Sequence, residues 1–61
     1  MSTMFTYHFK ATAPGHEKIA LCVDAVSLED AESDAREEAA DLLGVRAEHV
    51  ALACVLQQPN Y

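Results

Sequence analysis

Residues 27–44 decide the fold of this chain, and they read Ser-Leu-Glu-Asp-Ala-Glu-Ser-Asp-Ala-Arg-Glu-Glu-Ala-Ala-Asp-Leu-Leu-Gly. Ser27 is a favourable N-cap, because its hydroxyl can accept a hydrogen bond from an amide of the first helical turn. Asp30, three residues later, completes an approximate capping box. Gly44 stands where a helix needs a left-handed residue just after its last turn. These signals predict a helix over residues 28–43, about 24 Å long.

The two faces of this predicted helix differ in character. Apolar residues recur at spacings of three and four, which is typical of a stripe that faces a core: Leu28, Ala31, Ala35, Ala39 and Leu42, with Leu43 on the flank. Carboxylates occupy one narrow arc on the opposite face, at about 100° per residue. Four form its centre and two can widen it: Asp30, Asp34, Glu37 and Asp41, then Glu29 and Glu38.

The acidity of the helix exceeds what stability favours. Arg36 is the only basic residue in the helix, and it is placed to form an ion pair with Glu32 at i,i+4. Like charges at this spacing repel, so a helix selected for stability alone would contain more lysines. The acidic face is therefore the best functional clue in the sequence, and we interpret it as a binding surface for a partner.

Length and charge restrict the class of partner. The 61 residues are expected to form a single domain, 1–61, and ten acidic residues against four basic ones give a net charge of −6. Direct binding to nucleic acid needs Lys and Arg, so a basic protein surface is the more natural partner, including one that normally holds nucleic acid. The alternative interpretation is that the acidity only confers solubility. The sequence has no membrane-spanning or signal-peptide pattern, which predicts a cytoplasmic protein.

Three further segments alternate between apolar and polar residues and are predicted strands. The first two, Met4–Thr12 and Lys18–Val26, form a hairpin around a Pro14–Gly15 type II turn. The third, Val50–Gln57, ends before Pro59, with residues 1–3 a frayed start and residues 60–61 a tail. The side chains expected to face the helix are Phe5, Tyr7, Phe9, Ala11, Ile19, Leu21, Val23, Ala25, Val50, Leu52, Cys54 and Leu56.

The element order β-β-α-β predicts an α+β fold, a two-layer sandwich with one helix on a three-stranded sheet. The strand order 2-1-3 is favoured, and 1-2-3 is the alternative. One sheet face then stays uncovered, and it or an edge strand could join two copies, so a monomer or a weak homodimer is expected. That face would carry Thr6, His8, Lys10, Ala20, Cys22, Ala51, Ala53 and Val55.

The sequence contains no strong motif for catalysis or for metal binding. Cys22 and Cys54 would lie on opposite sides of the sheet, so they are not expected to form a disulfide. Either cysteine with His8 is the only candidate nucleophile–base set, and His8 and Cys22 with a carboxylate are the only conceivable zinc ligands. No ligand spacing or enclosed pocket accompanies them. We therefore predict a protein that is not an enzyme and has no metal or cofactor.

A very small acidic chain with this element order and an Asp/Glu-rich helix resembles the small proteins of phages and mobile elements. Among these it is similar to acidic anti-CRISPR proteins, some of which block a Cas surface that should hold DNA. The resemblance covers size, charge and element order over the whole chain and rests on the charge pattern of Glu29–Asp41. It implies an inhibitor that mimics DNA, acts in a bacterial host cell and binds a Cas protein or CRISPR effector complex. The alternative is a self-associating structural or accessory module that uses the open sheet face or an edge strand.

Overall fold

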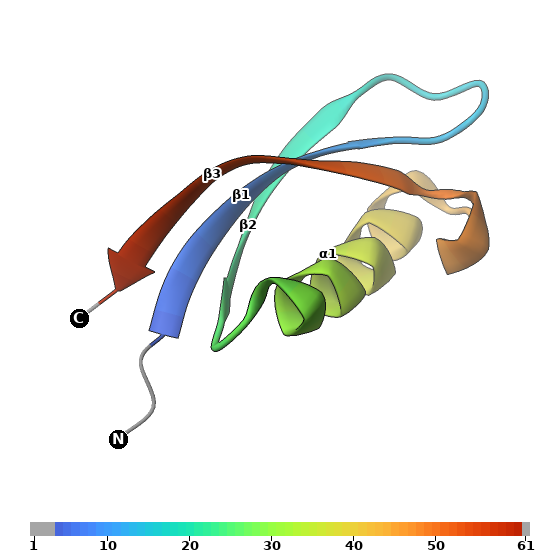
Figure 1. The fold of residues 1–61 in the computed structure, drawn as a ribbon. Helices are drawn as coiled ribbons and strands as arrows, with labels where there is room; N and C mark the ends of the chain where they lie inside the picture. Colours follow the sequence, from blue (N-terminus) through green and yellow to red (C-terminus); the bar gives the residue numbers. More distant parts are fainter. Residues whose placement is uncertain (1–3, 61) are drawn as a thin grey trace.

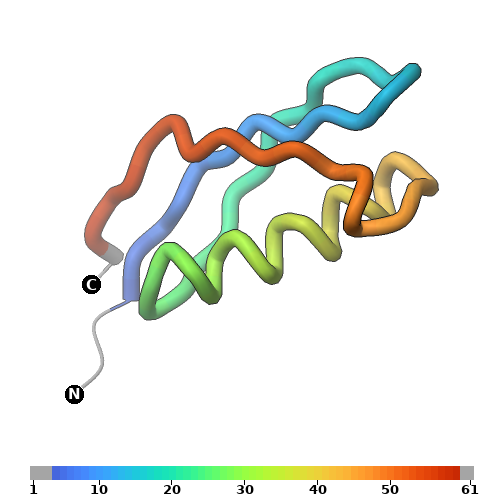
Figure 2. Tube along the Cα trace, turned by 45° about the vertical axis from the view of Figure 1, so that its right-hand side comes forward, coloured from blue at the N-terminus to red at the C-terminus, as the bar shows by residue number. Residues whose placement is uncertain are grey.

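A computed structural model describes residues 4–60 and shows an α+β fold in which one helix lies on one face of a three-stranded sheet (Figure 1). Residues 1–3 and 61, for which a frayed start and the end of a tail were predicted, lie outside the described residues. A view from a second side places the helix on the same side of the sheet, with the ends of the described chain at one end of the sheet (Figure 2). The elements are β1 (Met4–Thr12), β2 (Ile19–Ala25), α1 (Leu28–Leu43), a 3₁₀ turn η1 (Ala47–His49) and β3 (Ala51–Asn60).

The sheet has the order β2-β1-β3, and both pairs of neighbouring strands are antiparallel, which confirms the favoured prediction. The β1–β2 hairpin turns at Pro14–Gly15, where the His16 amide donates to the Ala13 carbonyl at 3.1 Å. Gly15 has a φ of 79°, the left-handed value that a type II turn requires at its third residue. Local turn chemistry therefore fixes the hairpin, and the helix then returns the chain to the free edge of β1.

The predicted caps define both ends of α1. The Ser27 hydroxyl accepts a hydrogen bond from the Asp30 amide at 3.2 Å. Gly44 adopts a left-handed conformation with φ 70°, and the Val45 amide donates to the Ala40 carbonyl at 3.0 Å. This pattern is that of a Schellman-type C-terminus, which satisfies carbonyls of the last turn. The observed bounds of the helix agree with those predicted from the sequence.

The helix packs on the sheet through alanine. Ala31, Ala35 and Ala39 are each 0% exposed, and the first two lie in one cluster with Tyr7 and Phe9. Because alanine adds only a methyl group, the helix axis can approach the aromatic rings of β1 closely. A second cluster contains Ala39 with Ala11, Ala40 and Val50 and extends the core toward η1.

Leu28 and Leu42 are 43% and 68% exposed, so the prediction that they belong to the core stripe was wrong. The buried residues Ala31, Ala35 and Ala39 form a row at a spacing of four, which rotates slowly around the helix axis and suits a twisted sheet. At about 100° per residue both leucines fall within the arc of the alanines, so direction around the helix does not explain their exposure. They stand in the first and last turns of α1, outside the segment from Ala31 to Ala40 that contains the buried residues of the helix.

Strand β3 departs from the prediction at its second half. The ladder between β1 and β3 shifts register between His8 and Phe9, so that one extra residue, Val55, enters β3. Leu56 pairs with His8 instead of facing the helix and is 49% exposed, so its predicted inward position was wrong. The strand also continues through Pro59, because an edge strand tolerates proline where its nitrogen faces away from the neighbouring strand. Asn60 therefore belongs to β3 rather than to a tail.

Within residues 4–60, no helix has the length and apolar character needed to cross a membrane.

Candidate functional site

The outward face of α1 carries the acidic residues predicted as a partner-binding site. We call Asp30, Asp34, Glu37 and Asp41 the acidic ridge, and all four side chains are exposed. The ridge faces away from the buried alanine row, because at about 100° per residue its centre falls about 130° around the helix from the centre of that row. From its first to its last residue the ridge runs about 16 Å along the helix axis. The same packing that buries the alanines thus orients the ridge toward solvent.

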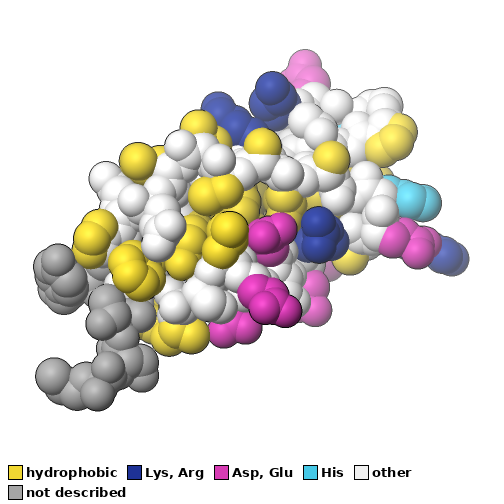
Figure 3. Space-filling model, viewed as in Figure 1, with side chains coloured by type: hydrophobic (Ala, Val, Ile, Leu, Met, Phe, Trp, Pro, Cys, Tyr) yellow, Lys and Arg dark blue, Asp and Glu magenta, His cyan; other side chains and the backbone are white. Residues whose placement is uncertain are grey.

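Two further acidic residues widen the ridge on opposite flanks. Glu29 and Glu38 are both exposed, and helical geometry places them on either side of the ridge arc. In the space-filling view, acidic side chains gather along the helix, while hydrophobic side chains form a separate patch between the helix and β3 (Figure 3). All six residues predicted as a partner-binding site are therefore exposed on α1.

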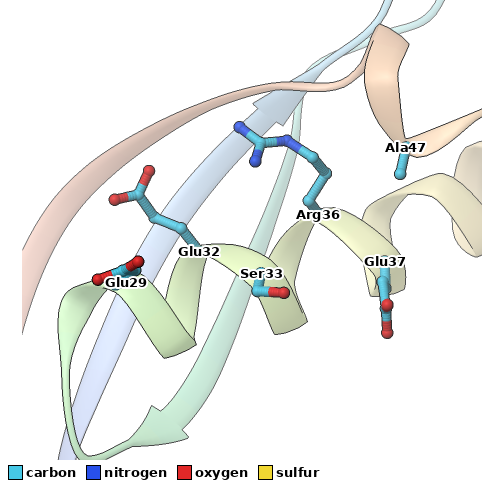
Figure 4. A pocket seen from close by; sticks show the side chains of 6 residues that line it. All are labelled: Glu29, Glu32, Ser33, Arg36, Glu37 and Ala47. Carbon is cyan, nitrogen blue, oxygen red and sulfur yellow. The ribbon is translucent and has the colours of Figure 1, made fainter.

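The carboxylates of α1 have no cationic partner within the described part of the chain. Ion pairs among residues 4–60 involve only Glu48, which lies 3.6 Å from the Arg46 guanidinium and 3.9 Å from the His49 ring. The predicted pair between Glu32 and Arg36 does not form, although both side chains extend toward β3 (Figure 4). The ridge is consequently free to contact cations of another molecule.

A shallow hollow follows one flank of the helix next to η1 (Figure 4). Arg36 and Ser33 place polar groups beside the carboxylates there, and Ala47 of η1 closes one end. An open hollow of this kind does not exclude water, so it offers no enclosed environment for chemistry. It does give the acidic surface a recess that a long basic side chain can enter. Its lining residues are Glu29, Glu32, Ser33, Arg36, Glu37 and Ala47.

The face of the sheet opposite the helix contains a second group of polar side chains. His8 of β1 lies between two partners: its Nδ1 is 3.1 Å from Cys22 Sγ, and its Nε2 is 3.0 Å from Gln58 Oε1. Beside this cluster, the Thr6 hydroxyl donates to Asp24 Oδ1 at 2.7 Å. The structure thus joins His8 and Cys22, which the sequence placed on one face, and adds Gln58.

The predicted separation of the two cysteines is confirmed. Cys22 pairs with His8 on the open face, whereas Cys54 pairs with Phe9 on the side of the helix, and both thiols are free and exposed. No group of three or more His, Cys, Asp or Glu side chains within residues 4–60 is arranged to hold a metal ion. The third member of this group is the Gln58 side-chain amide, whereas the predicted zinc site would need a carboxylate there.

Gln58 is the one residue of this cluster that sequence reasoning missed. The predicted third strand ended at Gln57, so Gln58 was not assigned to a face of the sheet. The register shift places Gln57 on the helix side, where its amide donates to the Tyr7 hydroxyl at 3.4 Å, and places Gln58 on the open face. Pairing of the edge strand, rather than a sequence motif, creates the contact.

Comparison of the chain with protein-family models, curated proteins and solved structures gave no significant match.

Proposed function

We propose that this protein is a non-enzymatic inhibitor whose acidic ridge occupies a basic, nucleic-acid-binding surface of another protein, in the manner of the anti-CRISPR proteins it resembles. The observation that carries the proposal is the exposure of all six predicted carboxylates on α1, none of which forms an ion pair within residues 4–60. Carboxylates so arranged can form charge-assisted hydrogen bonds to the Arg and Lys side chains that otherwise clamp phosphates. A Cas protein or CRISPR effector complex in the bacterial cytoplasm is the partner of this kind that we propose.

The position of Asp41 supports a role in binding rather than in folding. It lies near the C-terminal end of α1, where the helix dipole is negative, and the last turn contains no basic residue. A negative charge there is unfavourable for the helix, and so is its repulsion by Glu37, four residues earlier. Solubility alone could be met by acidic residues on the loops, where they would not oppose the helix dipole.

The spacing of the ridge suits a surface that binds phosphates. Its members are separated by about 4.5 or 6 Å along the axis. Successive phosphates on a nucleic-acid strand are separated by distances of the same scale. Complementary charge would also speed the encounter between the two proteins, and salt would weaken it by screening.

The experiment that tests this proposal is capture on the immobilised protein from a bacterial lysate, with elution by a salt gradient and by added DNA or RNA. The proposal expects a nucleic-acid-binding protein that elutes at moderate salt, is displaced by nucleic acid, and loses its own nucleic acid when this chain is added. A captured protein that binds this chain and its nucleic acid at the same time would contradict the proposal.

A second candidate function, self-association, is favoured by the open face of the sheet. Val55 and Leu56 are 60% and 49% exposed there, and they line a shallow apolar hollow with Ala20 and Cys22. Two such faces could bury each other, with the acidity serving only solubility. This candidate expects a salt-insensitive dimer at micromolar concentration that Val55→Glu disrupts. A strict monomer in sedimentation equilibrium would exclude it.

A further inference from the structure

Cys22, His8 and Gln58 form a line of hydrogen-bonding groups on the open face of the sheet, away from the acidic ridge. The sulfur lies 3.1 Å from one ring nitrogen of His8, and Gln58 Oε1 lies 3.0 Å from the other. Each residue comes from a different strand: β1 supplies the ring, β2 the thiol and β3 the amide. A nucleophile, a base and a group that orients the base are the parts that activate a thiol in proteins.

The hydrogen bond to Gln58 determines which nitrogen of His8 carries the proton. An amide oxygen only accepts hydrogen bonds, so with Gln58 Oε1 facing the ring, Nε2 must be the donor. A neutral imidazole then leaves Nδ1 unprotonated, where it accepts a hydrogen bond from the Cys22 thiol. In this arrangement of the Gln58 amide, His8 is in the tautomer that can take the thiol proton.

We propose that Cys22 is a nucleophilic thiol that exchanges with low-molecular-weight disulfides, with His8 as proton acceptor and Gln58 as positioning residue. The Cys22 proton passes to His8 Nδ1, and the thiolate attacks one sulfur of the disulfide. A new S–S bond forms at Cys22 as the original S–S bond breaks. The departing thiolate takes the proton from His8, which leaves one mixed disulfide on the protein and one free thiol. The Cys22 sulfur is oxidised and the departing sulfur is reduced, so the step balances.

The surroundings of Cys22 suit a small, anionic disulfide such as glutathione disulfide. Cys22 is exposed, and it lines a shallow hollow together with His8 and Lys10. The charged groups near this face are Lys10 from β1, Lys18 just before β2, which lines a neighbouring hollow with Lys10, and Asp24 from β2, which already accepts the Thr6 hydroxyl. Residues 51–59 of β3 contribute no titratable group to the open face, and the helix lies on the opposite side of the sheet (Figure 1). Lys10 lines the same hollow as Cys22 and is therefore the cation that we expect to meet a carboxylate of the disulfide.

Cys54 provides an internal control. It is also a free, exposed thiol, but within the described residues its Sγ forms a hydrogen bond only to the Leu56 carbonyl, at 3.8 Å, and none to an imidazole. Two single-cysteine variants of the same chain, Cys54→Ser and Cys22→Ser, therefore compare a thiol that has an adjacent base with one that lacks it.

The test measures the rate of glutathionylation by intact-protein mass spectrometry, with glutathione disulfide at about pH 7 and about pH 9.5. At the lower pH, the variant that retains Cys22 should react about tenfold or more faster than the variant that retains Cys54. At the higher pH the two rates should converge, because hydroxide in the solvent then replaces His8 as the proton acceptor. Equal rates at neutral pH, or a faster Cys54, would overturn the proposal.

Two further substitutions in the Cys54→Ser background identify the cause of a faster rate. His8→Gln should lower the rate of Cys22 at neutral pH to that of Cys54. The uncharged disulfide dithiodipyridine should rank the reaction rates of the variants in the same order. If the charge on Lys10 were the whole cause, Lys10→Met would abolish the advantage while His8→Gln would not, which contradicts the proposal. Circular dichroism confirms that each variant folds.

Gln58→Ala and Gln57→Ala form a matched pair that keeps the proposal testable even if the His8 variant does not fold. Gln58→Ala should slow Cys22 at neutral pH but not at high pH, because it releases His8 from the required tautomer. Gln57→Ala removes the neighbouring amide, which bonds to Tyr7 on the helix side, and should leave the rate unchanged. Equal effects of the two substitutions would remove the positioning role of Gln58.

Discussion

His8 and Phe9 are consecutive residues of β1, yet their partners in β3, Leu56 and Cys54, are two residues apart. The extra residue between them reverses the facing of β3 from Leu56 onward. Cys54 remains on the side of the helix, while Leu56 and Gln58 reach the open face. This single irregularity exposes an apolar side chain and completes the Cys22–His8–Gln58 cluster.

The register shift predicts that two leucines of β3 lose unequal amounts of unfolding free energy when each is replaced by alanine. Leu52 packs against both core clusters, so Leu52→Ala should lower the free energy of unfolding by about 2 kcal/mol. Leu56 is 49% exposed on the open face, so Leu56→Ala should cost less than about 1 kcal/mol. Urea denaturation of both variants checks the difference. Equal costs would show that Leu56 faces the core and that the ladder has no shift.

The alanine row predicts that α1 tolerates no larger side chain toward the sheet. Ala35 is fully buried beside Tyr7 and Phe9, so Ala35→Leu should destabilise the protein by about 1–3 kcal/mol through overpacking. Ser33→Leu, at an exposed position of the same helix, is the control and should change the free energy of unfolding by only a few tenths of a kcal/mol. If thermal unfolding showed similar losses for both, the helix would not rest on Ala35.

The Ser27 cap should contribute measurably to stability. Ser27→Ala removes the acceptor of the Asp30 amide and should cost about 1 kcal/mol, whereas Ser27→Gly should cost only a few tenths. The order of the two costs is the informative result, because loss of general helix propensity would make glycine the worse substitution. Chemical denaturation followed by circular dichroism distinguishes these outcomes.

The helix dipole predicts opposite effects for lysine at the two ends of the acidic ridge. Asp41→Lys should stabilise the protein by about 0.3–1 kcal/mol, because it places a cation near the negative end of α1. Asp30→Lys, in the first turn, should destabilise it by a similar amount. Both variants should bind the proposed partner more weakly. A less stable Asp41→Lys protein would mean that Asp41 has a structural role that the ridge assignment omits.

Local signals explain why most of the fold could be predicted from the sequence. The Ser27 and Gly44 caps, the Pro14–Gly15 turn and the alternation of β1 each act within a few residues and need no tertiary information. The strand order 2-1-3 was favoured because it lets a right-handed crossover carry the helix over one face of the sheet. These are the elements that the structure confirms.

The failures arise where tertiary packing decides. Residues 50–56 are apolar almost throughout, so their sequence does not fix which side chains face the helix, and only pairing with β1 reveals the extra residue. Likewise, the spacing of apolar residues in α1 fits several rows, and contact with the twisted sheet selects the row of Ala31, Ala35 and Ala39. Gln58 could not be assigned because its face depends on that same register.

The central claim, that the acidic ridge binds a basic surface, is tested most directly by comparing two doubly neutralised variants of equal net charge. Asp34→Asn with Glu37→Gln changes the ridge, whereas Glu17→Gln with Glu48→Gln changes exposed acids outside it. The measurement is the affinity of each variant for the captured partner at two salt concentrations. Our account predicts about tenfold or greater weakening for the ridge variant and a shallower salt dependence, with little change for the control. Equal weakening of the two variants would show that only net charge matters and would contradict the claim.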